Sequence, residues 1–434
     1  MRKKLQLSEG LRKILHNAGW MMGEQVLRMA TALFVNAWVA RRLGPSDFGL
    51  LSYVQSLAAL FVVVALLGMS RLLVRELVEQ SNDPQKRSTI VLTAFSYRML
   101  AAILLFGASV AISGWGHDTE RFVLAAFVST SILAAPFDSV YQYFQSLSQA
   151  RIPVIVRSVS FFAATGVKLF LLYHGAGLQE IVYATALEYA FTAIGLYYVY
   201  RKYGMQVRAR PNWRLGWTFV RETWPEIIAG LSGMLFMRLD QIMLESLQGT
   251  AAVGVFAVAA RLSEAWYFIP VSLVASAFPK IVKSRTDTKL YYTQISRLMV
   301  ALVALSYASG LGASLLSGPV VSWLYGPSYT ESASILCVHI WCGLLVGFGQ
   351  LSGAWLSAER RIVLNLYRNL LGLVVNVPLN YFLIPRFGPI GAAWATLISM
   401  TFGWYLFDMF NPLTRRMFII KSRALLLQKT VPAG

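Results

Sequence analysis

Apolar residues in this chain gather in long stretches that are separated by short polar gaps. About twelve stretches reach the roughly twenty largely apolar residues that a helix needs to cross a bilayer. They run over residues 17–41, 47–70, 88–112, 120–146, 152–173, 178–200, 218–247, 251–278, 290–316, 330–357, 362–385 and 389–411. No gap is long enough to fold as a separate domain. The pattern predicts an all-α membrane protein whose function resides in the helix bundle itself.

The gaps divide the stretches into two sets of six. A basic linker over residues 201–217 separates a predicted N-terminal lobe, residues 1–200, from a predicted C-terminal lobe, residues 218–411. The tail over residues 412–434 is basic with an apolar middle, so we expect it on the inner membrane surface. The first sixteen residues are basic and lack the apolar core of a signal peptide, which predicts a cytoplasmic interfacial segment.

The two sets of stretches carry matching turn motifs. Gly44 and Gly49, at the first outer turn, align with Gly249 and Gly254, at the turn between the seventh and eighth stretches. Copies with an even number of spans insert in the same orientation and are related by an axis along the membrane normal. We therefore expect two six-helix lobes that arose by duplication.

Basic residues alternate with the apolar stretches. Most of the 39 Lys and Arg residues lie before the first stretch and in every second gap, whereas the intervening gaps hold only Arg41, Arg42, Arg121 and Arg386. Basic residues beside short loops remain on the cytoplasmic side of a membrane. Both termini are therefore predicted to be cytoplasmic.

The composition agrees with a membrane protein: 56% of the residues are hydrophobic, 13% are aromatic and the mean hydropathy is +0.56. The net charge of +19 is confined to one predicted face, which favours anionic lipid headgroups over nucleic acid as the partner. Cys337 and Cys342 lie in one apolar stretch, so we expect no disulfide framework.

Arg41 and Arg121 stand at span ends and are counted with the outer gaps. Nine other basic residues fall within the predicted spans, where each costs roughly 2.5–3.5 kcal/mol on insertion scales. They are Arg28, Arg98, Arg157, Lys168, Arg221, Arg238, Arg261, Arg297 and Arg368. We expect Arg157, Arg221, Arg297 and Arg368 to reach the cytoplasmic headgroups, because each lies within about two turns of that end of its span.

Arg28, Arg98, Lys168 and Arg261 lie deeper, and Arg238 lies towards the outer side of its span. These five side chains are the candidates for contact with an anionic substrate. Two of them, Arg98 and Lys168, have no acidic residue one turn away on their own helix, which favours a water-filled cavity around them.

Acidic residues are present in or near the same spans. They are Glu24, Asp138, Glu188, Glu222, Glu226, Asp240, Glu264 and Asp408. Spacing allows Glu24 to pair with Arg28, and Arg261 with Glu264, on shared helix faces. Such pairs have two interpretations: neutralised charges that hold helices together, or a wet cavity whose carboxylates take up H+ or Na+.

Signals of an enzyme are weak in this sequence. His16, His117, His174 and His339 are widely separated and none has a metal-ligand partner at helical spacing. There is no P-loop, HExxH motif or nucleophile elbow, so we expect neither a catalyst nor a bound cofactor or metal. A membrane-embedded glycan polymerase or ligase stays open as an alternative, although the outer segments are short for one.

Four short motifs resemble those of the polysaccharide-export flippases of O-antigen type. They are Asn17–Trp20 with Glu24 and Arg28, Ala40–Pro45 with Phe48 and Gly49, Arg238–Leu244, and Gly254–Phe256 with Ala259–Arg261. This family belongs to the superfamily that also contains multidrug extruders and the lipid II flippase. The expected number of spans favours the O-antigen-type branch over the lipid II flippases, which have more.

The resemblance implies a fold like that of the multidrug and toxin extruders, with two lobes around a central cavity that opens alternately to each side. It implies an undecaprenyl-pyrophosphate-linked oligosaccharide as substrate, an ion gradient as driving force, and other glycan-assembly membrane proteins as partners. It also implies a location in the cell membrane of a bacterium or archaeon. A pyrophosphate in hydrocarbon needs compensating charge, and arginine binds phosphate in a bidentate manner.

We expect Arg28, Arg98, Lys168 and Arg261, and also Arg238, to bind the substrate. The acids Glu24, Asp138, Glu188, Asp240 and Glu264 are expected to take up the coupling ion or to pair with these bases. The acids in the spans nearly balance the bases, so a cation-coupled multidrug extruder of the same fold is the main alternative.

Overall fold

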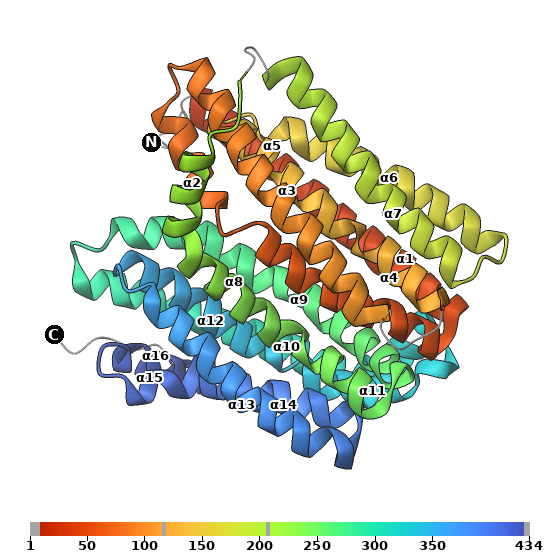
Figure 1. The fold of residues 1–434 in the computed structure, drawn as a ribbon. Helices are drawn as coiled ribbons and strands as arrows, with labels where there is room; N and C mark the ends of the chain where they lie inside the picture. The colour runs from red at the N-terminus through yellow and green to blue at the C-terminus, as the bar shows by residue number, and fades with distance from the viewer. Residues whose placement is uncertain (1–8, 115–118, 205–208, 429–434) are drawn as a thin grey trace. The chain divides into compact units, whose positions relative to one another are not determined.

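The computed structural model describes residues 9–114, 119–204 and 209–428, and in this part of the chain all regular secondary structure is helical (Figure 1). The helices before the predicted linker are α1 (Glu9–Ala65), α2 (Ser70–Glu79), α3 (Pro84–Gly114), α4 (Thr119–Ala134), α5 (Asp138–Ser146), α6 (Arg151–Tyr173) and α7 (Leu178–Val199). Each of the six predicted apolar stretches of this half lies on them.

The second half has the same character. Its helices are α8 (Trp213–Gln248), α9 (Thr250–Lys283), α10 (Thr288–Tyr325), α11 (Glu331–His339), α12 (Cys342–Ala358), α13 (Val363–Phe387), α14 (Pro389–Thr401), α15 (Phe407–Phe410) and α16 (Arg415–Leu425). Short 3₁₀ and π-helical turns join some of them. The predicted all-α membrane fold is confirmed.

Ten helices of the described chain are long and apolar enough to cross a membrane. The number differs from the predicted twelve because α1 contains two of the predicted stretches, and because α7 is not among the ten. Within α1 the backbone leaves the helical conformation at Gly44, whose φ of 77° is readily accessible only to glycine. The chain therefore bends between the two stretches.

Contacts group the chain into two compact units. The first unit contains Leu57–Ile228 and the chain up to Val39, and the second contains Ala40–Ser56 and the chain from Ala229 onwards. Helices α1 and α8 thus each contribute to both units. This grouping differs in two segments from the predicted division at the linker, which stays a prediction.

The aligned glycine motifs adopt the same conformation. Gly249, between α8 and α9, has φ 83° and ψ 177°, close to the φ 77° and ψ 174° of Gly44. The second glycine of each motif lies at a close contact within the second unit: a Cβ on Gly49 would lie 1.8 Å from the carbonyl oxygen of Thr250, and one on Gly254 2.0 Å from that of Pro45. The matched turns therefore pack against each other, which agrees with an internal duplication.

Each unit has its own buried apolar core. In the first unit the core centres on Met69, Leu73 and Phe144, and in the second on Met299 and Phe348. Other large apolar side chains point outwards, as expected where lipid rather than water covers the surface.

Candidate functional site

The first helix places a charged pair in the first unit. Arg28 Nε lies 3.6 Å from Glu24 Oε1, and Arg28 Nη2 donates to Gln25 Oε1 at 2.7 Å. Ser158, on α6, donates to Glu24 Oε1 at 2.6 Å. The pairing predicted from the spacing of Glu24 and Arg28 is confirmed. About a third of the Arg28 side chain is exposed.

Arg98, on α3, is completely buried in the first unit. Its Nε donates to the carbonyl oxygen of Leu66 at 3.1 Å, just after α1 ends. Its two terminal nitrogens donate to Ser139 Oγ at 3.0 Å, Gln142 Oε1 at 3.2 Å and Ser70 Oγ at 3.3 Å. The guanidinium thus holds the break between α1 and α2, and its donors are engaged by the protein.

Lys168 has an acidic partner on a neighbouring helix, since its Nζ lies 3.0 Å from Glu188 Oε2 on α7. Arg157 pairs with Asp138, just beyond the Pro136 turn that follows α4. Spacing along one helix cannot reveal such partners. The sequence argument for a cavity around Lys168 rested on that spacing, and this ion pair removes the argument.

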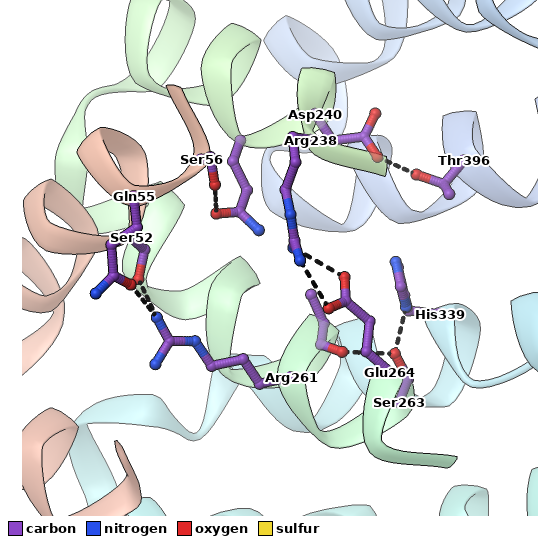
Figure 2. A network of polar contacts seen from close by, with 12 residues as sticks. Ser52, Gln55, Ser56, Arg238, Asp240, Arg261, Ser263, Glu264, His339 and Thr396 are labelled. Atoms are coloured by element: carbon purple, nitrogen blue, oxygen red, sulfur yellow. Dashed lines mark hydrogen bonds and ion pairs between the residues drawn. The ribbon is translucent and has the colours of Figure 1, made fainter. Parts of the chain in front are cut away.

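The second unit holds the denser polar network (Figure 2). Arg238, on α8, donates from its two terminal nitrogens to the two carboxylate oxygens of Glu264 at 3.0 and 3.2 Å. Arg261 instead donates to Ser52 Oγ at 3.2 Å and Gln55 Oε1 at 2.9 Å. The partner of Glu264 is therefore Arg238 on another helix, and not Arg261 one turn away as predicted.

Arg261 also lies over an aromatic ring, with its guanidinium carbon 4.6 Å from the centre of Phe48. Ser52, Gln55 and Phe48 all belong to the α1 segment that groups with the second unit. The neighbouring Ser56 donates to Gln241 Oε1 at 2.7 Å. Side chains of α8 and α9 thus bind this α1 segment through polar contacts.

Asp240 is buried on α8 and accepts hydrogen bonds from neutral groups. Asn376 Nδ2 donates to its Oδ1 at 3.1 Å, Asn380 Nδ2 donates to the same atom at 2.6 Å, and the hydroxyl of Thr396 donates to Oδ2 (Figure 2 shows Thr396). Among the described residues no Lys or Arg forms an ion pair with Asp240. The buried Oδ1 of Asn380 has no hydrogen-bond partner within the described structure.

The sequence reasoning missed the neutral members of this cluster. Asn376 and Asn380 lie one turn apart in the span over residues 362–385, and both are completely buried. A buried amide must find a hydrogen-bond partner, so polar residues at that spacing in a span are a usable signal.

One further prediction is corrected in the second unit. Arg368 was expected to reach the headgroups, but it is buried and pairs with Asp408. The other oxygen of Asp408 lies 2.7 Å from Lys421 Nζ on α16, and Lys421 also donates to the carbonyl oxygen of Trp404. The apolar face of α16, which includes Met417 and Ile420, is buried in the second unit. It therefore packs on protein.

The sequence is similar to those of known proteins of polysaccharide biosynthesis and export. The model of the polysaccharide biosynthesis protein family matches residues 14–285. The probable flippase AglR of Haloferax volcanii is 25% identical over 404 residues, which cover 90% of this chain and 82% of that protein. The EPS I polysaccharide export inner membrane protein EpsE of Ralstonia nicotianae is 25% identical over 347 residues, covering 75% and 77%.

Among solved structures, the lipid II flippase MurJ in an inward closed conformation has a TM-score of 0.75 at 14% identity, covering 94% of this chain and 91% of that chain. An inward-facing multidrug resistance transporter of the MATE family has a TM-score of 0.63 at 14% identity, covering 93% and 96%. The predicted extruder-like fold is confirmed. Because the family model matches more than half of the sequence, the chain belongs to the polysaccharide biosynthesis protein family.

Proposed function

We propose that this protein is a flippase that moves an anionic polyprenyl-pyrophosphate-linked oligosaccharide from the cytoplasmic to the outer leaflet by alternating access. Two relatives support this class of function, since AglR is named as a probable flippase and EpsE as a polysaccharide export protein. Neither is named as an enzyme, which agrees with the absence of catalytic motifs. The substrate, the direction and the ion coupling are parts of the proposal.

The observation that carries the proposal is the bidentate pair of Arg238 and Glu264 within predicted spans. A guanidinium fork that accommodates two carboxylate oxygens also accommodates two phosphate oxygens. About a quarter of the Arg238 side chain is exposed, so a ligand can reach it. A pyrophosphate that replaces Glu264 on Arg238 would release a carboxylate to take up a proton.

Arg28 offers the same exchange in the first unit, because it lies beside Glu24 and is partly exposed. Lys168, which pairs with Glu188, completes the proposed set of substrate contacts. Arg261 is left out, because its hydrogen bonds to Ser52 and Gln55 assign it to the α1 segment that it binds. Arg98 is left out, because its hydrogen bonds to Leu66, Ser139 and Gln142 assign it to the α1–α2 break.

Ion coupling is proposed to reside at Asp240. A buried carboxylate without a basic partner is costly unless a cation or a proton neutralises it. The carboxylate oxygens of Asp240 and the hydroxyl oxygen of Thr396 are hard donors that suit Na+. Their cluster therefore offers a site for Na+, or for H+ on the carboxylate.

Translocation by purified protein in liposomes tests the proposal. The probe is a fluorescent undecaprenyl-pyrophosphate-linked glycan whose appearance in the other leaflet is followed by chemical quenching. Arg238→Gln is expected to slow translocation by about tenfold or more, because a charge-assisted bidentate contact contributes roughly 1.5–3 kcal/mol. The control is Lys86→Gln, which removes a basic residue at an exposed surface pair.

Wild-type rates in Arg238→Gln would contradict the role of Arg238, and a wild-type protein that moves no lipid-linked glycan would contradict the function itself. The buried Asp240 also favours a second candidate, a cation-coupled multidrug extruder of the same fold. Efflux of a cationic dye by the same liposomes, without glycan-lipid translocation, would select that alternative.

A further inference from the structure

An apolar groove of about 560 Å³ lies between α4 and α7 in the first unit. Its walls are one face of α7, with Tyr183, Leu187 and Ala190, and the facing side of α4 with the turn that follows it, including Leu133 and Phe137. At one end, Phe127 and Tyr183 meet edge to face with ring centres 4.5 Å apart. The groove is thus an aromatic-walled channel between two predicted spans.

The lining excludes water and charged ligands. The hydroxyl of Thr130, a polar group in the wall, donates to the carbonyl oxygen of Phe127 at 2.6 Å. A groove of this kind within a bilayer is filled by hydrocarbon, because neither water nor a charged group finds partners there.

The other end of the groove leads to a basic residue. Ala193 lines the groove, and α7 continues from it past Tyr197 to Val199. Arg201 follows in the π-helical turn Tyr200–Gly204. Arg201 is exposed and forms no ion pair with a described residue. A chain lying in the groove would therefore have a cation available for an anionic head.

The depth of the groove distinguishes a long chain from an ordinary acyl chain. With a rise of 1.5 Å per residue, Ala193 lies roughly 12 Å and Tyr183 roughly 27 Å from Arg201 along the helix. One leaflet of hydrocarbon is only about 15 Å deep. A phospholipid whose head lies at Arg201 would therefore reach little beyond Ala193, whereas the groove continues past the midplane.

We propose that this groove binds the polyprenyl chain of the lipid-linked substrate, with its phosphate end near Arg201. The inference rests on the proposed function and adds a site for the hydrocarbon part of the substrate. The aromatic walls suit a methyl-branched, unsaturated chain, and the depth requires one longer than a leaflet.

Binding of undecaprenyl phosphate and of the short farnesyl phosphate to the purified full-length protein, followed by native mass spectrometry, tests the inference. The wild type is expected to prefer the long chain. Ala190→Trp fills the groove at an exposed position and should weaken undecaprenyl phosphate binding by at least about tenfold, since several buried methylene-sized contacts are lost. Ala163→Trp, at an exposed position on α6 outside the groove, is the matched control and should bind as the wild type does.

Equal binding by wild type and Ala190→Trp, or equal competition by phosphatidylglycerol, would overturn the proposed groove site. So would a wild type that translocates glycan lipid without any chain-length preference, although the proposed function would then still stand. Arg201→Gln should lower affinity for both prenyl phosphates and preserve the preference between them. An unchanged affinity in that variant would overturn the assignment of the phosphate end.

Discussion

Basic side chains within the spans differ in which groups accept their hydrogen bonds, and this difference separates a structural role from a role in transport. Arg98 donates to a main-chain carbonyl and to neutral side chains, so it satisfies acceptors that burial would otherwise leave unpaired. Arg238 and Arg28 face carboxylates and remain partly exposed. A carboxylate partner can be exchanged for a phosphate, whereas the carbonyl of a helix end cannot move away. We therefore assign a structural role to the arginines whose partners are neutral, and a role in transport to the arginines that face carboxylates.

Replacing Arg98 is accordingly expected to lower stability. Arg98→Gln leaves the Leu66 carbonyl and at least one neighbouring oxygen without a donor, which should destabilise the protein by on the order of 3 kcal/mol. Thermal unfolding in detergent measures the effect, with Arg221→Gln at an exposed position on α8 as the control. A melting temperature like that of the control would show that the Leu66 carbonyl does not depend on Arg98.

Asp240 should determine the response to the coupling ion. In the wild type, Na+ or acid is expected to raise the melting temperature relative to K+ at neutral pH, because either one neutralises the buried carboxylate. Asp240→Asn is uncharged and should lose this response, as measured by thermal unfolding across ion and pH series. Identical responses in the two proteins would remove Asp240 from the proposed coupling mechanism.

At the scale of elements, the two glycine turns and the last helix are each held in place by close packing contacts. The turn at Gly44–Gly49 contacts the turn at Gly249–Gly254 so closely that neither second glycine can carry a side chain. Helix α16 is bound differently, by the buried Lys421 together with an apolar face. Both features attach a peripheral segment to the second unit.

A methyl group at the glycine contact should be poorly tolerated. Gly254→Ala places Cβ 2.0 Å from the Pro45 carbonyl oxygen, so the turns must separate and the protein should lose stability. Gly312→Ala, on α10 with nothing within 4 Å of its Cβ, should be neutral or stabilising by up to about 1 kcal/mol. Their melting temperatures compare the two sites, and equal values would show that the contact is dispensable.

The docking of α16 should depend on pH. Burial, opposed by the attraction of Asp408 and aided by the repulsion of Arg368, lowers the pKa of Lys421 from an ordinary value of 10.5 to about 8. The folded protein therefore binds this proton less tightly than the unfolded chain does, so stability should rise as pH increases from about 8 towards 10.5. The gain between pH 7 and 9 is about 1 kcal/mol.

Lys421→Met should lack that gain, because methionine cannot titrate. Chemical unfolding of both proteins at the two pH values measures it. A parallel pH dependence in wild type and variant would show that Lys421 is not the group responsible.

For the whole molecule, the alternation of basic and less basic gaps predicts on which side of the membrane each gap and each terminus lies. With an even number of spans and the basic gaps inside, both termini should face the cytoplasm. Reporter fusions at each terminus, fluorescent in the cytoplasm or enzymatically active outside, measure the orientation. An external location of either terminus would contradict the charge argument and reverse the proposed direction of transport.

The helices, the glycine turns and the contacts within one helix depend on residues close together in the sequence, so the sequence alone determined them. Stretches of about twenty apolar residues form helices because a chain in lipid must satisfy its own backbone hydrogen bonds, and all twelve predicted stretches lie on helices. The positive-φ turns at Gly44 and Gly249 follow equally from the residue type. The fold class and the Glu24–Arg28 pair were predictable for this reason.

Tertiary packing decided which charges meet. Glu264 pairs with a residue on another helix, Lys168 finds Glu188 across α6 and α7, and Asp240 is surrounded by amides from α13. The groove between α4 and α7 likewise exists only where those two helices approach each other. Spacing along one helix specifies the neighbours on its own face, whereas contacts between helices depend on rotations and crossing points that the packing of the whole bundle sets.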